Sequence, residues 1–138
     1  MRIIIIASAA VILLAGCAAR ADGPAAQAAS AERDGKYETD LAKALEGRTA
    51  GEPVTCINQR DIRSVKGVGD RTLIYEMNSR LLYRNDPPGG CRLRSSETII
   101  TRTSSNQLCR GDIARIADLT TGVETDGCGL GDFVPYRN

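Results

Sequence analysis

The cysteines are the feature that most restricts what this chain can fold into. The 138-residue sequence has no histidine and no tryptophan, and it has five cysteines: Cys17, Cys56, Cys91, Cys109 and Cys128. No two of them have the C-x-x-C spacing of a zinc site, and no histidine is present to complete one, so we expect no metal and no cofactor. Four or more cysteines in an exported domain are typical of a disulfide framework. The odd count raises the question of whether Cys17 belongs to that framework.

Cys17 directly follows an apolar N-terminal segment. Arg2 precedes residues 3–14, which are apolar apart from Ser8, and the small residues Ala15 and Gly16 follow. This is the pattern of a secretory signal peptide. Residues 14–17, Leu-Ala-Gly-Cys, resemble the bacterial lipobox, whose cysteine is lipidated and becomes the first residue of the mature protein. We therefore predict a lipoprotein signal peptide over residues 1–16 and lipidation of Cys17. The alternatives are an ordinary cleaved secretory peptide and an uncleaved membrane anchor.

A lipidated Cys17 would hold the mature protein on a membrane, because two or more acyl chains bind firmly. Position 18 is alanine rather than aspartate, which by resemblance to enterobacterial sorting rules favours the periplasmic face of the outer membrane. The chain has 18 basic and 17 acidic side chains, and loss of Arg2 with the signal leaves 17 of each. Nucleic-acid binding normally needs a clear basic excess, so we expect no nucleic-acid partner. The membrane contact is expected through the lipid on Cys17.

Once Cys17 is assigned to the signal, four cysteines remain, at positions 56, 91, 109 and 128. We predict two disulfides, because the periplasm is oxidising. Spacing alone leaves all three pairings open. Each bridge would close a loop of tens of residues and contribute about 3–4 kcal/mol on the chain-entropy model. With one phenylalanine and four tyrosines the core has few large side chains, so these bridges matter.

The mature chain divides into two predicted parts. Residues 17–35 are rich in alanine and small polar residues, which predicts a flexible tether. The remaining residues, 36–138, form the predicted domain. It starts with a short amphipathic helix, because Tyr37, Leu41 and Leu45 recur on one helical face.

After this helix the sequence is typical of short strands separated by turns. The runs that predict strands are residues 54–57, 62–65, 72–77, 80–84, 97–103, 112–117 and 133–136. Pro135 in the last run predicts an edge position, and the glycine-rich residues 127–132 predict a tight turn. Such spacing indicates an all-β class, as a small antiparallel meander or a partly open barrel stapled by two disulfides. The barrel is favoured because closure removes exposed sheet edges.

Four stretches of the chain resemble a known family. They are EGRTAGEPVTCINQRDIRS, TLIYEMNSRLLYRN, NQLCRGDIARIAD and GLGDFVPY, which together span about residues 45–136. They resemble small exported and lipoprotein domains of unknown function from sphingomonads and related proteobacteria. The resemblance implies fold and location but transfers no catalytic residue. Some of those relatives carry counterparts of Cys56 and Cys109 but not of the other two, which implies the pairs Cys56–Cys109 and Cys91–Cys128.

The residues that carry chemistry do not form a recognisable catalytic motif. Without histidine, general acid–base catalysis would depend chiefly on carboxylates. The aspartates beside glycines, prolines and strand ends are Asp61, Asp70, Asp86, Asp112 and Asp132, positions typical of turn chemistry. We therefore expect a non-catalytic binding or structural module of the cell envelope. The alternatives are an inhibitor of an envelope or lytic enzyme and a small hydrolase with a carboxylate pair. An exposed apolar patch or protruding loop would favour binding or inhibition.

Charge gives one weak indication of a binding surface. Residues 60–115 contain eleven basic and six acidic side chains, whereas from residue 116 onward four acids face one arginine. The basic-face candidates are Arg60, Arg63, Arg80, Arg84, Arg92, Arg94 and Arg102. Such a face would bind anionic lipid or an acidic protein. The alternative is a solvated charge pattern at strand edges that discourages aggregation.

Overall fold

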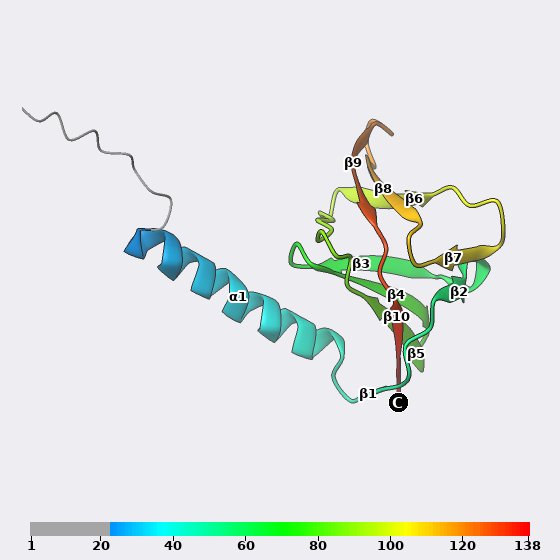
Figure 1. Ribbon diagram of the computed structural model, residues 1–138, viewed down its shortest axis with the longest axis horizontal. Coiled ribbons are helices and arrows are strands. Elements are labelled where there is room, and N and C mark those ends of the chain that lie inside the picture. The colour runs from blue at the N-terminus through cyan, green and yellow to red at the C-terminus, as the bar shows by residue number, and fades with distance from the viewer. Residues whose placement is uncertain (1–22) are drawn as a thin grey trace, which may run out of the picture.

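The computed structural model describes residues 23–138 (Figure 1). The predicted signal peptide and Cys17 lie outside the described residues. The elements, in chain order, are α1 (Pro24–Ala44), β1 (Thr49–Ala50), β2 (Cys56–Asn58), a 3-10 turn η1 (Gln59–Asp61), β3 (Ser64–Val68), β4 (Thr72–Asn78), β5 (Leu81–Asn85), β6 (Glu97–Thr101), β7 (Gln107–Cys109), β8 (Ile113–Asp118), β9 (Glu124–Gly129) and β10 (Phe133–Arg137). Within residues 23–138, no helix combines the length and the apolar character needed to cross a bilayer.

The predicted class, mostly antiparallel β with one helix and two disulfides, is confirmed. The strands form a five-stranded sheet in the order β1-β10-β5-β4-β3, a three-stranded sheet in the order β6-β8-β9, and the pair β2-β7. These sheets are not closed into a barrel, so the preference for a barrel was wrong. The β3-β4-β5 meander stops because the chain leaves the sheet after Asn85, in a loop with two prolines. The sheet then continues with β10, which pairs with both β5 and β1.

Helix α1 begins earlier than the sequence pattern predicted. It starts at Pro24, so most of the segment predicted as a flexible tether over residues 17–35 is helical. Alanine has the highest helix propensity, and proline suits the first helical position. Every residue from Pro24 to Lys36 is exposed, and this half of α1 projects beyond the sheets in Figure 1. The second half packs as predicted, with Leu41 buried and Tyr37 half-buried against the domain.

The five-stranded sheet separates two apolar clusters, because successive strand residues point to opposite faces. On one face, Ile74 of β4 packs with Val68, Leu82 and Leu41 of the helix. On the other face, the larger cluster lies between this sheet and the two smaller sheets. Its buried members are Ile57, Leu73, Tyr75, Met77, Cys91, Leu108, Ala114, Ile116, Cys128, Leu130 and Phe133. The domain is therefore a layered structure with the five-stranded sheet in the middle.

The two disulfides are Cys56–Cys109 and Cys91–Cys128, the pairs that the family resemblance implied. Cys56 and Cys109 lie directly opposite each other on β2 and β7, with their Cα atoms 4.0 Å apart. Cys91 lies in the loop after β5 and joins β9 at Cys128, with a Cα separation of 5.5 Å. The second bridge is buried in the larger cluster, whereas both cysteines of the first are half-buried.

Two local expectations near the C-terminus were wrong. Residues 127–129 belong to β9 rather than to a tight turn. Pro135 lies on β10, which has neighbours on both sides. The Pro135 carbonyl accepts a hydrogen bond from the Gly51 N–H at 2.7 Å, so it faces away from β5. In an antiparallel strand the nitrogen and the carbonyl of one residue face the same side, so the Pro135 nitrogen also faces away from β5. There the short β1 has already ended, and no ladder hydrogen bond is lost.

Candidate binding site

The β8–β9 hairpin ends in a loop with two exposed aliphatic side chains. Leu119 is 63% exposed and Val123 is 60% exposed, the highest values among the large apolar residues of the described chain. The hairpin protrudes from the body of the domain, at the end opposite the C-terminus in Figure 1. We define residues 118–124 as the hairpin tip. An exposed pair of this kind on a protruding loop is what the binding hypothesis requires.

Asp118 holds the tip in one conformation through its side chain. Its Oδ1 accepts hydrogen bonds from the backbone N–H groups of Thr121 at 2.8 Å and Thr120 at 2.9 Å. The Thr121 hydroxyl also donates to the same oxygen, at 3.1 Å. These hydrogen bonds, above all those from the two backbone N–H groups, lower the pKa of Asp118 below its ordinary value. The carboxylate therefore stays ionised, and the turn stays capped, at pH values where an ordinary aspartate begins to protonate.

Backbone hydrogen bonds close the same loop. The Asp118 N–H donates to the Val123 carbonyl at 3.0 Å, and the Gly122 N–H donates to the Asp118 carbonyl at 2.8 Å. Gly122 has a φ of +69°, a left-handed conformation that glycine adopts without a steric penalty. The Leu119 N–H donates to the Ser96 carbonyl at 2.9 Å, which attaches the tip to the start of β6. The tip is thus an ordered loop that presents Leu119 and Val123 to solvent.

The charges around the tip are arranged unequally. Glu124 pairs with Arg115 at 2.9 Å and with Arg102 at 3.5 Å, so this single carboxylate is shared by two arginines and the trio keeps one positive charge. Asp118 and Asp126 have no ion-pair partner among residues 23–138. Asp126 instead accepts a hydrogen bond from the Gly127 N–H at 2.7 Å. The five charged groups together carry a net charge of −1, and the two carboxylates without an ion pair in the described chain, Asp118 and Asp126, are both negative.

The seven arginine candidates are distributed over several elements. Arg84, Arg92, Arg94 and Arg102 each pair with a carboxylate, respectively Asp86, Asp70, Glu97 and Glu124. Arg60, Arg63 and Arg80 are exposed, and no carboxylate of the described residues pairs with them. Arg63 shares a shallow cavity of about 270 Å³ with Arg48 and Glu76. Binding of an anionic surface by these arginines stays a prediction.

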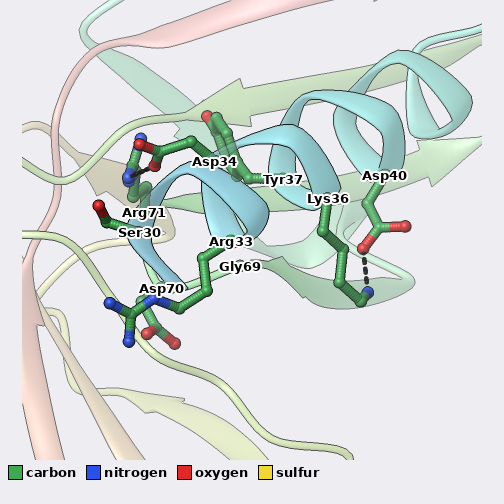
Figure 2. Close-up of a pocket in the computed structure, with 9 residues that line it drawn as sticks. All are labelled: Ser30, Arg33, Asp34, Lys36, Tyr37, Asp40, Gly69, Asp70 and Arg71. Atoms are coloured by element: carbon green, nitrogen blue, oxygen red, sulfur yellow. Dashed lines mark hydrogen bonds and ion pairs between the residues drawn. The ribbon is translucent and has the colours of Figure 1, made fainter. Parts of the chain in front are cut away.

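A groove lies between α1 and the turn that joins β3 to β4 (Figure 2). Its volume is about 490 Å³, and its lining includes three cations and three carboxylates. Arg71 forms an ion pair with Asp34, and its guanidinium lies 5.1 Å from the centre of the Tyr37 ring. Lys36 pairs with Asp40 at 2.6 Å. The charges of the groove therefore balance, which favours a role in holding the helix on the sheet.

A chain of hydroxyl contacts lies beside this groove. The Tyr37 hydroxyl is 2.8 Å from the Thr72 hydroxyl oxygen, and Thr72 donates to Asp86 Oδ1 at 2.5 Å. Arg84 Nε also donates to Asp86, at 2.8 Å to its second oxygen. Thr72 is fully buried at the start of β4, so its hydroxyl needs these partners. These hydrogen bonds join α1 to β4 and to the loop after β5, and we call them the polar latch.

Four of the five aspartates considered for catalysis have separate local partners, and the fifth, Asp61, is exposed at the end of η1. Asp70 and Asp86 pair with arginines as above, and Asp132 pairs with Arg110 at 3.2 Å. Asp112 accepts a hydrogen bond from the Cys109 N–H at 2.7 Å, as expected of an aspartate in a turn. Across residues 23–138 no group of three or more potential ligand side chains is placed to hold a metal ion.

Comparisons with known proteins give no further indication, since no family model, no curated protein and no solved structure matches the chain. The hairpin tip was not identified as a site from the sequence. The signal that could have identified it is the run Leu119-Thr-Thr-Gly-Val123, in which two large aliphatic residues flank turn-forming residues. A core residue rarely occupies such a position, because the loop around it faces water.

Proposed function

We propose that this protein is a non-catalytic binding module of the bacterial cell envelope, anchored to the membrane through lipidated Cys17. The single observation that supports a binding role best is the ordered hairpin tip with its exposed Leu119 and Val123. Isolated exposed aliphatic residues are common on protein surfaces, but here two of them share one hydrogen-bonded loop. An ordered loop loses little conformational entropy when a partner binds it, so its apolar area contributes more fully to affinity.

The form of helix α1 supports the anchoring part of the proposal. Its exposed half points away from the sheets (Figure 1), and Cys17 precedes this half in the sequence. A lipid at Cys17 would then be separated from the β domain by several helical turns. This arrangement leaves the tip accessible while the chain is held at a membrane.

Replacement of the lipidated residue tests the anchor. In a Cys17→Ser variant we expect the protein to move from the membrane fraction to the soluble fraction of disrupted cells. Cys56→Ala together with Cys109→Ala is the matched control, since it removes cysteines without touching the anchor. Full membrane retention of Cys17→Ser would contradict lipidation at this position.

Crosslinking in the native envelope tests the binding role. A tagged protein should form crosslinks to a specific neighbour, and these should be lost when Leu119 and Val123 are both replaced by serine. The control variant carries serine at Val54, which is 37% exposed at another place in the fold. Recovery of only lipids and abundant porins from all three proteins would refute a specific partner.

Inhibition of an envelope or lytic enzyme is the second candidate, favoured by the same observation. An ordered, protruding loop with an aliphatic anchor is well suited to enter the cleft of an enzyme. An inhibitor would reduce the activity of its crosslinked partner, and Leu119→Ser would relieve that inhibition. A binding module without inhibitory activity would leave the turnover of the partner unchanged.

A further inference from the structure

We propose that the hairpin tip inserts into an apolar pocket of a partner protein whose rim carries basic side chains. This inference rests on the proposed binding function and specifies the chemistry of the surface that receives Leu119 and Val123. Two classes of surface accept exposed aliphatic side chains, a protein pocket and the apolar layer of a membrane. The charges around the tip distinguish them.

The negative charges at the tip disfavour a lipid surface. Asp118 and Asp126 flank the two aliphatic side chains without a cationic partner among the described residues. Arg102 and Arg115 both pair with Glu124 rather than with Asp118 or Asp126. Membrane-inserting segments rely on cations that meet anionic headgroups, and this tip presents the opposite sign. A pocket with basic residues at its rim has the matching potential.

The rigidity of the loop further favours a preformed pocket. The hydrogen bonds to Asp118 Oδ1 and the backbone hydrogen bond from Gly122 are all made within the tip. Its shape is therefore set before binding, with the Asp118 N–H bonded to the Val123 carbonyl across the turn that carries Leu119 and Val123. A pocket that buries both side chains would gain affinity in proportion to the apolar area that it removes from water. Charges at the rim of such a contact chiefly affect the rate of association and its dependence on salt.

The test uses the full-length, lipidated protein with a photoreactive benzoylphenylalanine in place of Val123. Irradiation of the native envelope should yield a discrete protein adduct, which is absent when the same residue replaces Val54. We expect Asp126→Asn to reduce the yield about threefold and Asp126→Lys about tenfold, with both effects weaker at high salt. Asparagine retains a side-chain oxygen for the Gly127 N–H, so this variant separates charge from local structure.

A second measurement addresses the membrane directly. The Cys17→Ser protein, which lacks the anchor, is sedimented with vesicles of phosphatidylcholine or of phosphatidylglycerol. We expect no binding to either vesicle that depends on Leu119 and Val123.

The outcomes separate this inference from the proposed function. If a protein adduct forms at Val123 and its yield is the same with Asp126, Asp126→Asn and Asp126→Lys, the partner pocket has no basic rim, and the binding role stands. Adducts to lipid alone, or tip-dependent sedimentation with vesicles, would overturn the protein pocket in favour of membrane insertion. Equal labelling from Val54 and Val123, or no adduct from Val123, would refute the binding role of the tip and this inference with it.

Discussion

The two faces of the five-stranded sheet are covered in different ways. One face is covered by the two smaller sheets, each of which contains at least one disulfide cysteine, and they bury a large cluster around Leu73, Tyr75 and Phe133. The other face is covered by half of one helix, which buries only Leu41 fully and adds a polar latch from Tyr37 to Thr72. The first face therefore determines whether the domain folds. The second determines whether α1 stays attached to the sheet. We therefore expect α1 to detach without unfolding of the sheet.

The largest expected effect comes from the buried bridge on the first face. Cys91→Ala combined with Cys128→Ala should lower the free energy of unfolding by about 4–5 kcal/mol, since it frees a long loop and also removes buried sulfur atoms. Urea unfolding followed by circular dichroism measures the change. Cys56→Ala with Cys109→Ala is the control. It frees a longer loop, with a sequence separation of 53 against 37, but the entropic difference is small and both residues are half-buried, so its total cost should be smaller. A greater loss in the control would reverse our ranking of the two bridges.

A smaller effect is expected on the helix side. Leu41→Ala should weaken attachment of α1 by about 2–3 kcal/mol, because this leucine is the one helical side chain that is fully buried in the described residues. Amide hydrogen exchange should rise throughout α1 and stay slow in β4 and β5. Glu38→Ala, at an exposed position of the same helix, is the matched control. Equal loss of protection in the sheet would show that the two faces do not unfold separately.

The polar latch is expected to contribute less than the apolar contact. Tyr37→Phe removes the hydroxyl that meets Thr72 but keeps the aromatic ring beneath Arg71. We expect a cost of about 1 kcal/mol, because Thr72 retains its hydrogen bond to Asp86 and is not left unsatisfied. Hydrogen exchange of α1 again provides the measurement. A cost as large as that of Leu41→Ala would mean that the latch, rather than apolar packing, holds the helix.

The smallest change should be stabilising and lies on the first face. The hydroxyl of Tyr75 is buried without a hydrogen-bond partner in the described part of the chain, and burial raises the pKa of this side chain. Tyr75→Phe should therefore raise the free energy of unfolding by up to about 1 kcal/mol, since the unsatisfied group is removed and the ring contact with Phe133 is kept. Thermal unfolding measures this change. A clear loss of stability would show that the hydroxyl has a partner after all.

The sequence supported the parts of this fold that depend on local patterns. The helical face of Tyr37 and Leu41 was evident from its spacing, and the β4–β5 hairpin from β-branched residues on both arms. Strand β9 was missed because its residues, Glu-Thr-Asp-Gly-Cys-Gly, have low strand propensity, so only its pairing with β8 and the bridge at Cys128 make it a strand. The open arrangement of sheets depends on non-local pairing, above all of β10 with β5.

The site was harder to predict than the fold, for a related reason. The net arginine excess was visible in the sequence, but ion pairs such as Arg102–Glu124 join residues far apart in the chain. The tip was overlooked because exposure of Leu119 depends on the path of two strands rather than on its neighbours. Asn85 is a comparable case, since its buried side chain bonds the Gly131 backbone across 46 positions. No periodicity in the sequence indicates such a contact.

Unwinding of the exposed turns of α1 would lengthen the chain. Residues 24–33 bury no side chain, so their unwinding would disturb neither apolar cluster. As a helix this segment spans about 15 Å, and as an extended chain it spans about 35 Å. A helix of this length has little stability of its own, so the two forms differ by a small free energy. Unwinding would therefore more than double the end-to-end distance of residues 24–33, and the folded domain that follows them would remain intact.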